Sequence, residues 1–136
     1  MTPQELKMIS AQMKCCPVDK TFKIVGHKFT IHILRNMMLL NQTRFKEFLD
    51  SIEGVNPKTL SVRLREMEKS DLIKRKVYPE TPIRVEYTIT EKGEALKPII
   101  MQMAAFSMKY CSCDVFKDGR PRTVDQVFGK LAMKVS

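Results

Sequence analysis

Residues 56–70, with the sequence NPKTLSVRLREMEKS, decide the fold of this chain. Asn56 is a favourable helix N-cap, and Pro57 occupies the first helical position, where a backbone N–H would have no intrahelical partner. The positions that repeat at helical spacing and should be buried are Leu60, Leu64 and Met67. The spacing therefore predicts an amphipathic helix from Pro57 to about Ser70.

A shorter amphipathic helix is predicted immediately before it. Its apolar positions, at i, i+3, i+4 and i+7, are Phe45, Phe48, Leu49 and Ile52. Thr43 is the expected N-cap, and Gly54 is expected to close the helix in a left-handed conformation. Two helices joined by such a short, glycine-containing turn indicate a helix-turn-helix unit.

The segment after residue 70 predicts two strands, Ile73–Pro79 and Arg84–Thr90, with the sequence PETP at 79–82 supplying the turn. A basic hairpin directly after a helix-turn-helix is the order of elements in a winged helix. The predicted fold class is therefore mainly α with a small β-hairpin (α+β). We expect a winged helix-turn-helix with extra helices at both ends of the chain.

Three helices are predicted before this core. The first spans Gln4–Met13, and the second ends at Gly26. The third runs from His27 to about Leu40, and its apolar residues spread round most of the helix, which is typical of a helix at the centre of a domain. Lys28 and Arg35 are expected to share its polar side.

A long helix is predicted after the hairpin, capped by Thr90, kinked at Pro98 and reaching Tyr110. Its apolar stripe comprises Leu96, Ile99, Ile100, Met103, Phe106 and Tyr110. Because this stripe outruns the core of a small domain, we expect it to meet a second subunit. In the tail we expect a loop at 118–122, a capping box at 123–126 and a short helix. The apolar face of that short helix comprises Val127, Phe128, Leu131 and Val135.

The overall charge points to a polyanionic partner without locating it. The 136 residues carry a net charge of +9, with 24 Lys and Arg against 15 Asp and Glu. Residues 1–54, 55–90 and 91–136 each hold 8 basic and 5 acidic residues, which gives +3 in each part. A 43% hydrophobic fraction is typical of a globular chain, and no apolar run approaches the roughly 18 residues of a membrane span. Without a leader-like N-terminus, a cytoplasmic protein is expected.

A candidate DNA-binding face lies on the helix predicted from Pro57. Opposite its buried row stand Lys58, Val62, Arg65 and Lys69, with Thr59, Ser61 and Arg63 on the shoulders. Arginine can bridge guanine O6 and N7, and an apolar side chain can contact a thymine methyl group. The helix start, from Asn56, offers backbone N–H groups to phosphate. The alternative is an ordinary solvated helix face.

The predicted hairpin is also basic. Its cations are Lys74, Arg75, Lys76 and Arg84. Arg84 at the tip could enter a minor groove or contact the phosphate beside it. The alternative is that these charges protect an exposed sheet edge from pairing with other strands.

Seven short motifs lie along residues 15–110: CPV at 16–18, GHKFT at 26–30, ILR at 33–35, RF at 44–45, PKTL at 57–60, RLREME at 63–68 and RVEYTITEKG at 84–93. Through these motifs, of which the last is the most specific, the chain resembles the HxlR-type family of winged-helix transcriptional regulators. Phe29 departs from the tryptophan usual in the family, and the tail from Cys111 lies outside the match.

The resemblance implies a cytosolic homodimer that binds double-stranded operator DNA. Residues 1–14 and 91–110 would form the dimer, 15–90 would be the winged-helix core, and 111–136 would be an extension of uninherited role. The helix from Pro57 would recognise bases and the hairpin would be the wing. Arg44, in the RF motif, joins the candidate DNA-binding residues.

The four cysteines occur as Cys15-Cys16 and Cys111-Ser112-Cys113. Structural disulfides are disfavoured in the cytosol, and the paired C-x₂-C spacing of a zinc site is absent, so no metal is expected. Some relatives in this family sense electrophiles or oxidants through the cysteine that corresponds to Cys16. A position at a helix start favours the reactive thiolate. The alternative is a small buried hydrophobic residue.

No enzyme activity and no cofactor are expected. His27 and His32 do not share a helix face, and the sequence holds neither a phosphate-binding glycine loop nor a nucleophile elbow. The predicted function is a sequence-specific DNA-binding transcriptional regulator, with a small-molecule or oxidant effector left open. The alternatives are an architectural DNA-binding protein and a winged-helix module for protein–protein assembly.

Overall fold

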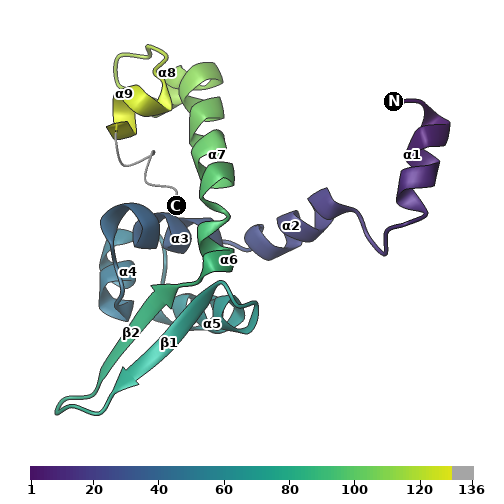
Figure 1. The fold of residues 1–136 in the computed structure, drawn as a ribbon. Helices are drawn as coiled ribbons and strands as arrows, with labels where there is room; N and C mark the ends of the chain where they lie inside the picture. Colours follow the sequence, from purple (N-terminus) through teal and green to yellow (C-terminus); the bar gives the residue numbers. More distant parts are fainter. Residues whose placement is uncertain (130–136) are drawn as a thin grey trace.

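The structure, a computed structural model, describes residues 1–129. Its elements, in chain order, are α1 (Pro3–Ser10), α2 (Pro17–Val25), α3 (Thr30–Leu40), α4 (Phe45–Ser51), α5 (Pro57–Lys69), β1 (Ile73–Tyr78), β2 (Arg84–Ile89), α6 (Glu91–Glu94), α7 (Lys97–Tyr110), α8 (Ser112–Val115) and α9 (Val124–Phe128). Helices α3, α4 and α5 cluster beside the hairpin, while α1 and α2 extend to one side and α7 rises away from the cluster (Figure 1). The predicted fold class is confirmed.

The helix-turn-helix is formed by α4 and α5. Asn56 caps α5 as predicted, because its Oδ1 accepts a hydrogen bond of 2.8 Å from the Thr59 backbone N–H. The inward residues of α5 are buried as predicted: Leu60, Leu64 and Met67 are 0–2% exposed. They pack with Phe48 of α4, which is fully buried.

The predicted ends of α4 need correction. Arg44, not Thr43, precedes the helix, because the Glu47 carboxylate accepts hydrogen bonds from the backbone N–H groups of both residues, at 3.0 Å from Arg44 and 3.2 Å from Thr43. The helix ends at Ser51, and the extended conformation of Ile52 turns the chain. Gly54 has the expected left-handed backbone, with φ of 81°, but it lies in the turn rather than at the helix end.

Helix α3 is central, as predicted, but it begins three residues later than expected. Phe29 adopts a left-handed backbone with φ of 76°, and its ring is 93% covered, so the chain turns there before the helix starts. Lys28 therefore lies before the helix and does not share a helical side with Arg35. Within α3, the buried Asn36 donates to Gln42 at 3.1 Å and to Ser51 at 2.9 Å, which links α3 to α4.

Strands β1 and β2 form an antiparallel hairpin in the register Ile73↔Ile89 to Tyr78↔Arg84. Each strand ends one residue earlier than predicted, because Pro79 cannot donate to the ladder and Thr90 caps α6. The base of the hairpin is anchored by Thr90, which bonds through its N–H to the Leu72 carbonyl at 3.0 Å. In addition, the Tyr87 N–H donates to the Thr43 carbonyl at 2.7 Å, so β2 is tied to the chain that leads into α4.

The long C-terminal helix is interrupted rather than only kinked. Thr90 caps the short α6, and α7 starts at Lys97, with Pro98 in its first turn. Ala95 and Leu96 keep helical backbone angles, so the interruption is local and follows from the N–H that Pro98 lacks. Gly93 is buried in α6. A Cβ there would overlap the Leu72 carbonyl oxygen and lie 2.7 Å from Cγ1 of Ile89.

The C-terminal segment contains one helix, α8, that the sequence interpretation did not include. The predicted capping box is confirmed, since the Gln126 N–H donates to the Thr123 hydroxyl and the Thr123 N–H donates to the Gln126 side chain. Helix α9 follows, and it packs beside α7. Leu131 and Val135 of the predicted apolar face lie outside the described residues.

At the other end, α1 also has a capping box, between Thr2 and Glu5. The Thr2 backbone N–H, and then its hydroxyl, lower the pKa of the Glu5 carboxyl. The helix is shorter than predicted, ending at Ser10, and its apolar side chains Leu6 and Ile9 are exposed. Within residues 1–129 no helix is long and apolar enough to cross a membrane.

Candidate nucleic-acid interface

The exposed face of α5 carries cations that lie opposite the buried row. Lys58, Arg65 and Lys69 are exposed, and Val62 between them is 38% exposed. Within the described part of the chain, none of the three cations forms an ion pair. Thr59 and Ser61 are half-buried on the shoulders. The arrangement offers exposed hydrogen-bond donors and one apolar contact along a single side of the helix.

Arg63 differs from these neighbours. Its Nε donates to the Lys28 backbone carbonyl at 2.7 Å, and its Nη1 donates to the Glu66 carboxylate at 2.8 Å. Its side chain is only 18% exposed. The guanidinium group therefore joins α5 to the turn before α3, so Arg63, which was predicted on a shoulder of the DNA-binding face, is engaged within the protein.

The hairpin brings further cations to the same end of the molecule as α5 (Figure 1). Lys74, Arg75 and Lys76 are exposed on β1. Arg84 lies where β2 leaves the turn, opposite Tyr78, and its guanidinium carbon is 4.1 Å from the centre of the Tyr78 ring. Its Nη2 lies 3.4 Å from Oε1 of Glu80. The wing therefore holds one ordered arginine, Arg84, and three exposed cations on β1, of which Lys76 lies 4.9 Å from the centre of the Tyr78 ring.

Glu86 joins the wing to the helix-turn-helix. Its Oε1 lies 3.6 Å from Nε of Arg84 and 3.9 Å from Nη2 of Arg44, the residue that precedes α4. The sequence interpretation missed Glu86, and it missed Tyr78 and Glu80, the other two partners of Arg84. The available signal was the i, i+2 spacing of Arg84 and Glu86, which puts both side chains on one face of a strand.

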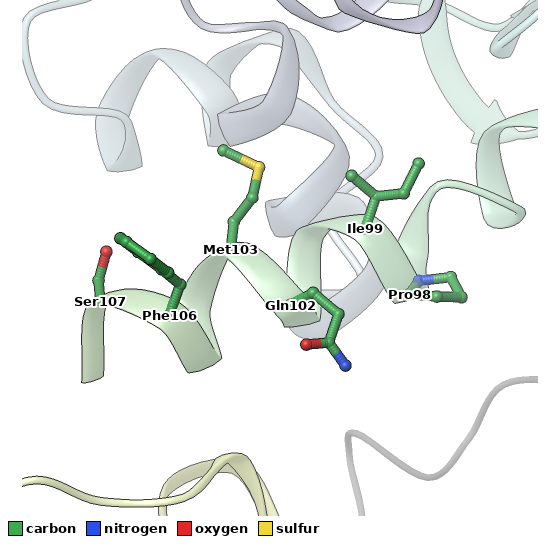
Figure 2. Close-up of a pocket in the computed structure, with 6 residues that line it drawn as sticks. All are labelled: Pro98, Ile99, Gln102, Met103, Phe106 and Ser107. Atoms are coloured by element: carbon green, nitrogen blue, oxygen red, sulfur yellow. The ribbon is translucent and has the colours of Figure 1, made fainter. Parts of the chain in front are cut away.

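A second surface feature is apolar and lies on α2 and α7. A groove of about 710 Å³ is lined by Val18, Phe22 and Val25 of α2 together with Ile99 and Met103 of α7. An adjoining hollow of about 590 Å³ continues along α7 past Phe106. Figure 2 shows Ile99 and Met103 projecting from one side of α7, while Gln102 points the other way. Most of the predicted stripe is thus uncovered in a single chain.

The cysteines of the described residues are free thiols, and Cys15, Cys16 and Cys113 are exposed. Cys16 is the residue that precedes α2. The alternative interpretation of Cys16 as a buried hydrophobic residue is wrong for this chain. Residues 1–129 contain no cluster of three His, Cys, Asp or Glu side chains that could hold a metal ion.

The two histidines lie on the rim of the α2–α7 groove. The His32 ring packs edge-on against Phe29, with 5.9 Å between ring centres. Partial burial, followed by the charge of Arg35, lowers the pKa of His32.

An exposed row of cations on the second helix of a helix-turn-helix, followed by a basic hairpin, defines a winged-helix DNA-binding protein. The sequence profile of the HxlR-like helix-turn-helix family matches residues 24–115. The chain therefore belongs to the HxlR-like family, and it is a DNA-binding transcriptional regulator.

Individual relatives support this assignment. The HTH-type transcriptional regulator YodB of Bacillus subtilis is 35% identical over 100 residues, which cover 71% of this chain and 86% of YodB. The solved reduced form of YodB is similar with a TM-score of 0.62 at 34% identity, covering 74% of this chain and 98% of that one. The redox regulator HypR in its oxidized form has a TM-score of 0.61 at 31% identity, covering 68% and 94%. These relatives are regulators, and they indicate no catalytic family.

Proposed function

We propose that the chain acts as a homodimer in the cytoplasm, without enzyme activity, with α5 in the major groove of operator DNA and the hairpin at the adjacent minor groove. The observation that carries this proposal is the α5 face, where exposed Lys58, Arg65 and Lys69 lie opposite a fully buried row. If the α5 face were only solvated, there would be no reason to expect a basic hairpin at the same end of the molecule.

The proposed contacts divide by chemistry. Arg65 and Val62 at the middle of the helix contact base edges, with Thr59 and Ser61 beside them. Lys58, Lys69 and the helix start at Asn56 contact phosphates, because flexible ammonium groups and the positive end of a helix suit anionic oxygens. Arg44, before α4, and Arg84, at the wing, contact the phosphate backbone of the DNA. Arg63, held by Lys28 and Glu66, supports the helix from within the protein.

In the proposed dimer, residues 1–14 and 91–110 are the dimerisation elements. Residues 15–90 form the DNA-binding core, whose helix α2 adds its apolar surface to the interface beside α7. Met103, Phe106 and Tyr110 are 50–68% exposed in the single chain, and a second copy would cover them. In the dimer, the two α5 helices would stand about 34–36 Å apart, the separation of successive major grooves on one face of DNA. A chain that stays monomeric at micromolar concentration would contradict this arrangement.

A thiol signal at Cys16 is the proposed input. The thiol is exposed beside the start of α2, which also lines the dimer groove, so its oxidation would alter the surface that two subunits share. The similarity to redox regulator HypR supports this proposal. The Cys16→Ser chain should bind operator DNA normally and lose the response to oxidant. A variant that still responds would remove Cys16 from the mechanism.

The experiment that tests the DNA-binding mode is titration of a duplex selected by the chain from a random pool, and of a shuffled duplex, at several salt concentrations. A regulator retains a strong preference for the selected duplex at physiological salt. An architectural protein binds both duplexes alike, and a protein–protein module shows no salt-dependent binding to either. Either of the last two results would overturn the proposed function.

A further inference from the structure

A carboxylate lies among the cations of the proposed DNA-binding surface. Glu86 is 25% exposed and its Oε1 faces two arginines, Arg84 from its own strand and Arg44 from the start of α4. A negative charge near the DNA backbone opposes binding by repulsion from phosphate. A carboxylate at this position is therefore expected to have a role that offsets its repulsion from phosphate.

Several contacts confine the guanidinium group of Arg84, the arginine of the wing. Arg84 stacks on Tyr78 at 4.1 Å and reaches Glu80 at 3.4 Å through Nη2. Its Nε is buried and makes no hydrogen bond within residues 1–129, and at 3.6 Å Glu86 Oε1 is close enough for an ion pair only. The guanidinium group is thus oriented by the stack and by two carboxylates together.

Arg44, the arginine of the helix-turn-helix, is held near Glu86 by a hydrogen bond between neighbouring backbone groups as well as by charge. The Tyr87 N–H, next to Glu86, donates to the Thr43 carbonyl, next to Arg44, at 2.7 Å. Glu86 and Arg44 are therefore carried on backbones that are directly bonded. Two guanidinium groups within 4 Å of one oxygen would repel each other without the carboxylate between them.

We propose that Glu86 is a positioning residue that holds Arg44 and Arg84 at one spacing, so that the helix-turn-helix and the wing engage the same stretch of phosphate backbone. The proposal rests on the proposed function. Glu86 lowers the attraction to DNA of any sequence and raises the discrimination between sequences, because an ordered pair of arginines fits only a backbone of matching shape.

The test uses the full chain and the two duplexes above, with three variants. Glu86→Asp keeps the charge but shortens the reach, so it cannot serve both arginines. Glu86→Gln keeps the shape and removes the charge. Glu91→Gln makes the same charge change on α6, outside the arginine cluster, and is the matched control.

We expect the preference of Glu86→Asp for the selected duplex to fall about three- to tenfold, with an unchanged slope of log Kd against log salt. Glu86→Gln should lose preference to a similar extent while binding the shuffled duplex more tightly, with a slope steeper by about one. The Glu91→Gln control should keep the preference. Preferences of both Glu86 variants within about twofold of the parent would overturn the proposal, since coupled pairs exceed that limit.

A double-mutant cycle of Arg44→Ala and Arg84→Ala decides the matter independently of how well the Glu86 variants fold. In the otherwise unchanged chain, the two losses of affinity should be coupled by about threefold or more, because both arginines share one carboxylate. Additive losses would show that the arginines act separately and would end the proposal. A parent chain with no preference between the duplexes would instead refute the proposed function.

Discussion

The inner helices α3–α5 and the outer helices α2 and α7 differ in how much of their apolar surface a single chain covers, although Ile100 and Met101 of α7 also reach the core. In the inner group Ile33, Phe48 and Leu60 are fully buried within one chain. In the outer group Phe22, Met103 and Phe106 are 50–67% exposed. Both groups carry apolar residues at helical spacing, so the sequence pattern alone does not reveal which surface covers those residues. The apolar residues of the inner group are covered within the chain, and the exposed ones of the outer group are proposed to be covered by a second copy.

The largest expected effect breaks the inner group. Phe48→Ala removes a fully buried ring that packs edge-on against Tyr87 at 6.4 Å between centres. We expect a loss of about 3–5 kcal/mol in the free energy of unfolding, because a large cavity is left in the core. Denaturant unfolding followed by circular dichroism measures it. A loss below about 1 kcal/mol would show that the site collapses around the smaller side chain.

The same type of substitution in the outer group should act on association instead. Phe106→Ala should weaken the dimer by about 1.5–3 kcal/mol for each copy, the value of burying one such ring. Analytical ultracentrifugation gives the dissociation constant, and circular dichroism at low concentration checks that the monomer stays folded. An unchanged dimer would place Phe106 outside the interface and would remove the contrast between the two groups.

Arg65 and Arg63 sharpen the comparison on one helix. Arg65→Ala should reduce binding to the selected duplex by about 1–3 kcal/mol and relax base choice, if it reads a base edge. Arg63→Ala should mainly reduce stability, because the Lys28 carbonyl and Glu66 lose their donor. Binding titrations and thermal melts of both variants separate the two roles. Equal loss of affinity of Arg65→Ala for every sequence would assign Arg65 to phosphate.

The smallest expected effect concerns His32, on an inner helix at the rim of the outer groove. Its pKa is lowered by partial burial and then by Arg35, so the folded chain binds that proton less readily than the unfolded chain. The contribution of the neutral His32 ring to the free energy of unfolding is therefore complete above the ordinary pKa of 6.5. It decreases as the pH falls through the lowered pKa of the folded chain. Unfolding measured between about pH 5 and pH 8 should show this decrease, and His32→Asn should reduce it. The same pH slope in both chains would contradict this expectation.

The core could be predicted from the sequence because its signals are local. The Asn56 cap, the Pro57 start and the buried row of α5 all appear within one helix, and the structure confirms them. The start of α3 could not be placed, because the left-handed backbone at Phe29 follows from burying its ring against residues distant in the chain. Phenylalanine has no local preference for that conformation.

The candidate site shows the same division. The exposed row of α5 follows from helical period, so Lys58, Arg65 and Lys69 could be identified without a structure. The role of Arg63 depends on the Lys28 carbonyl, which lies 35 residues earlier in the chain. The meeting of Arg44 with Glu86 likewise depends on the pairing of β2 with the chain before α4. Such long-range contacts leave no periodic trace in the sequence.

The buried Gly93 has a consequence for the length of DNA that a dimer can accept. Since any Cβ there would overlap the Leu72 carbonyl oxygen, α6 rests directly on the backbone that leaves α5. Main-chain contact at Gly93 therefore helps to set the path from α5 to α7, and the Lys92 ammonium group of α6 adds a hydrogen bond of 2.7 Å to the Ser70 carbonyl. In the proposed dimer, joined through α7, this path would fix the gap between the two half-sites of the operator. Inserting one base pair at the operator centre should then be tolerated less well than many base changes there.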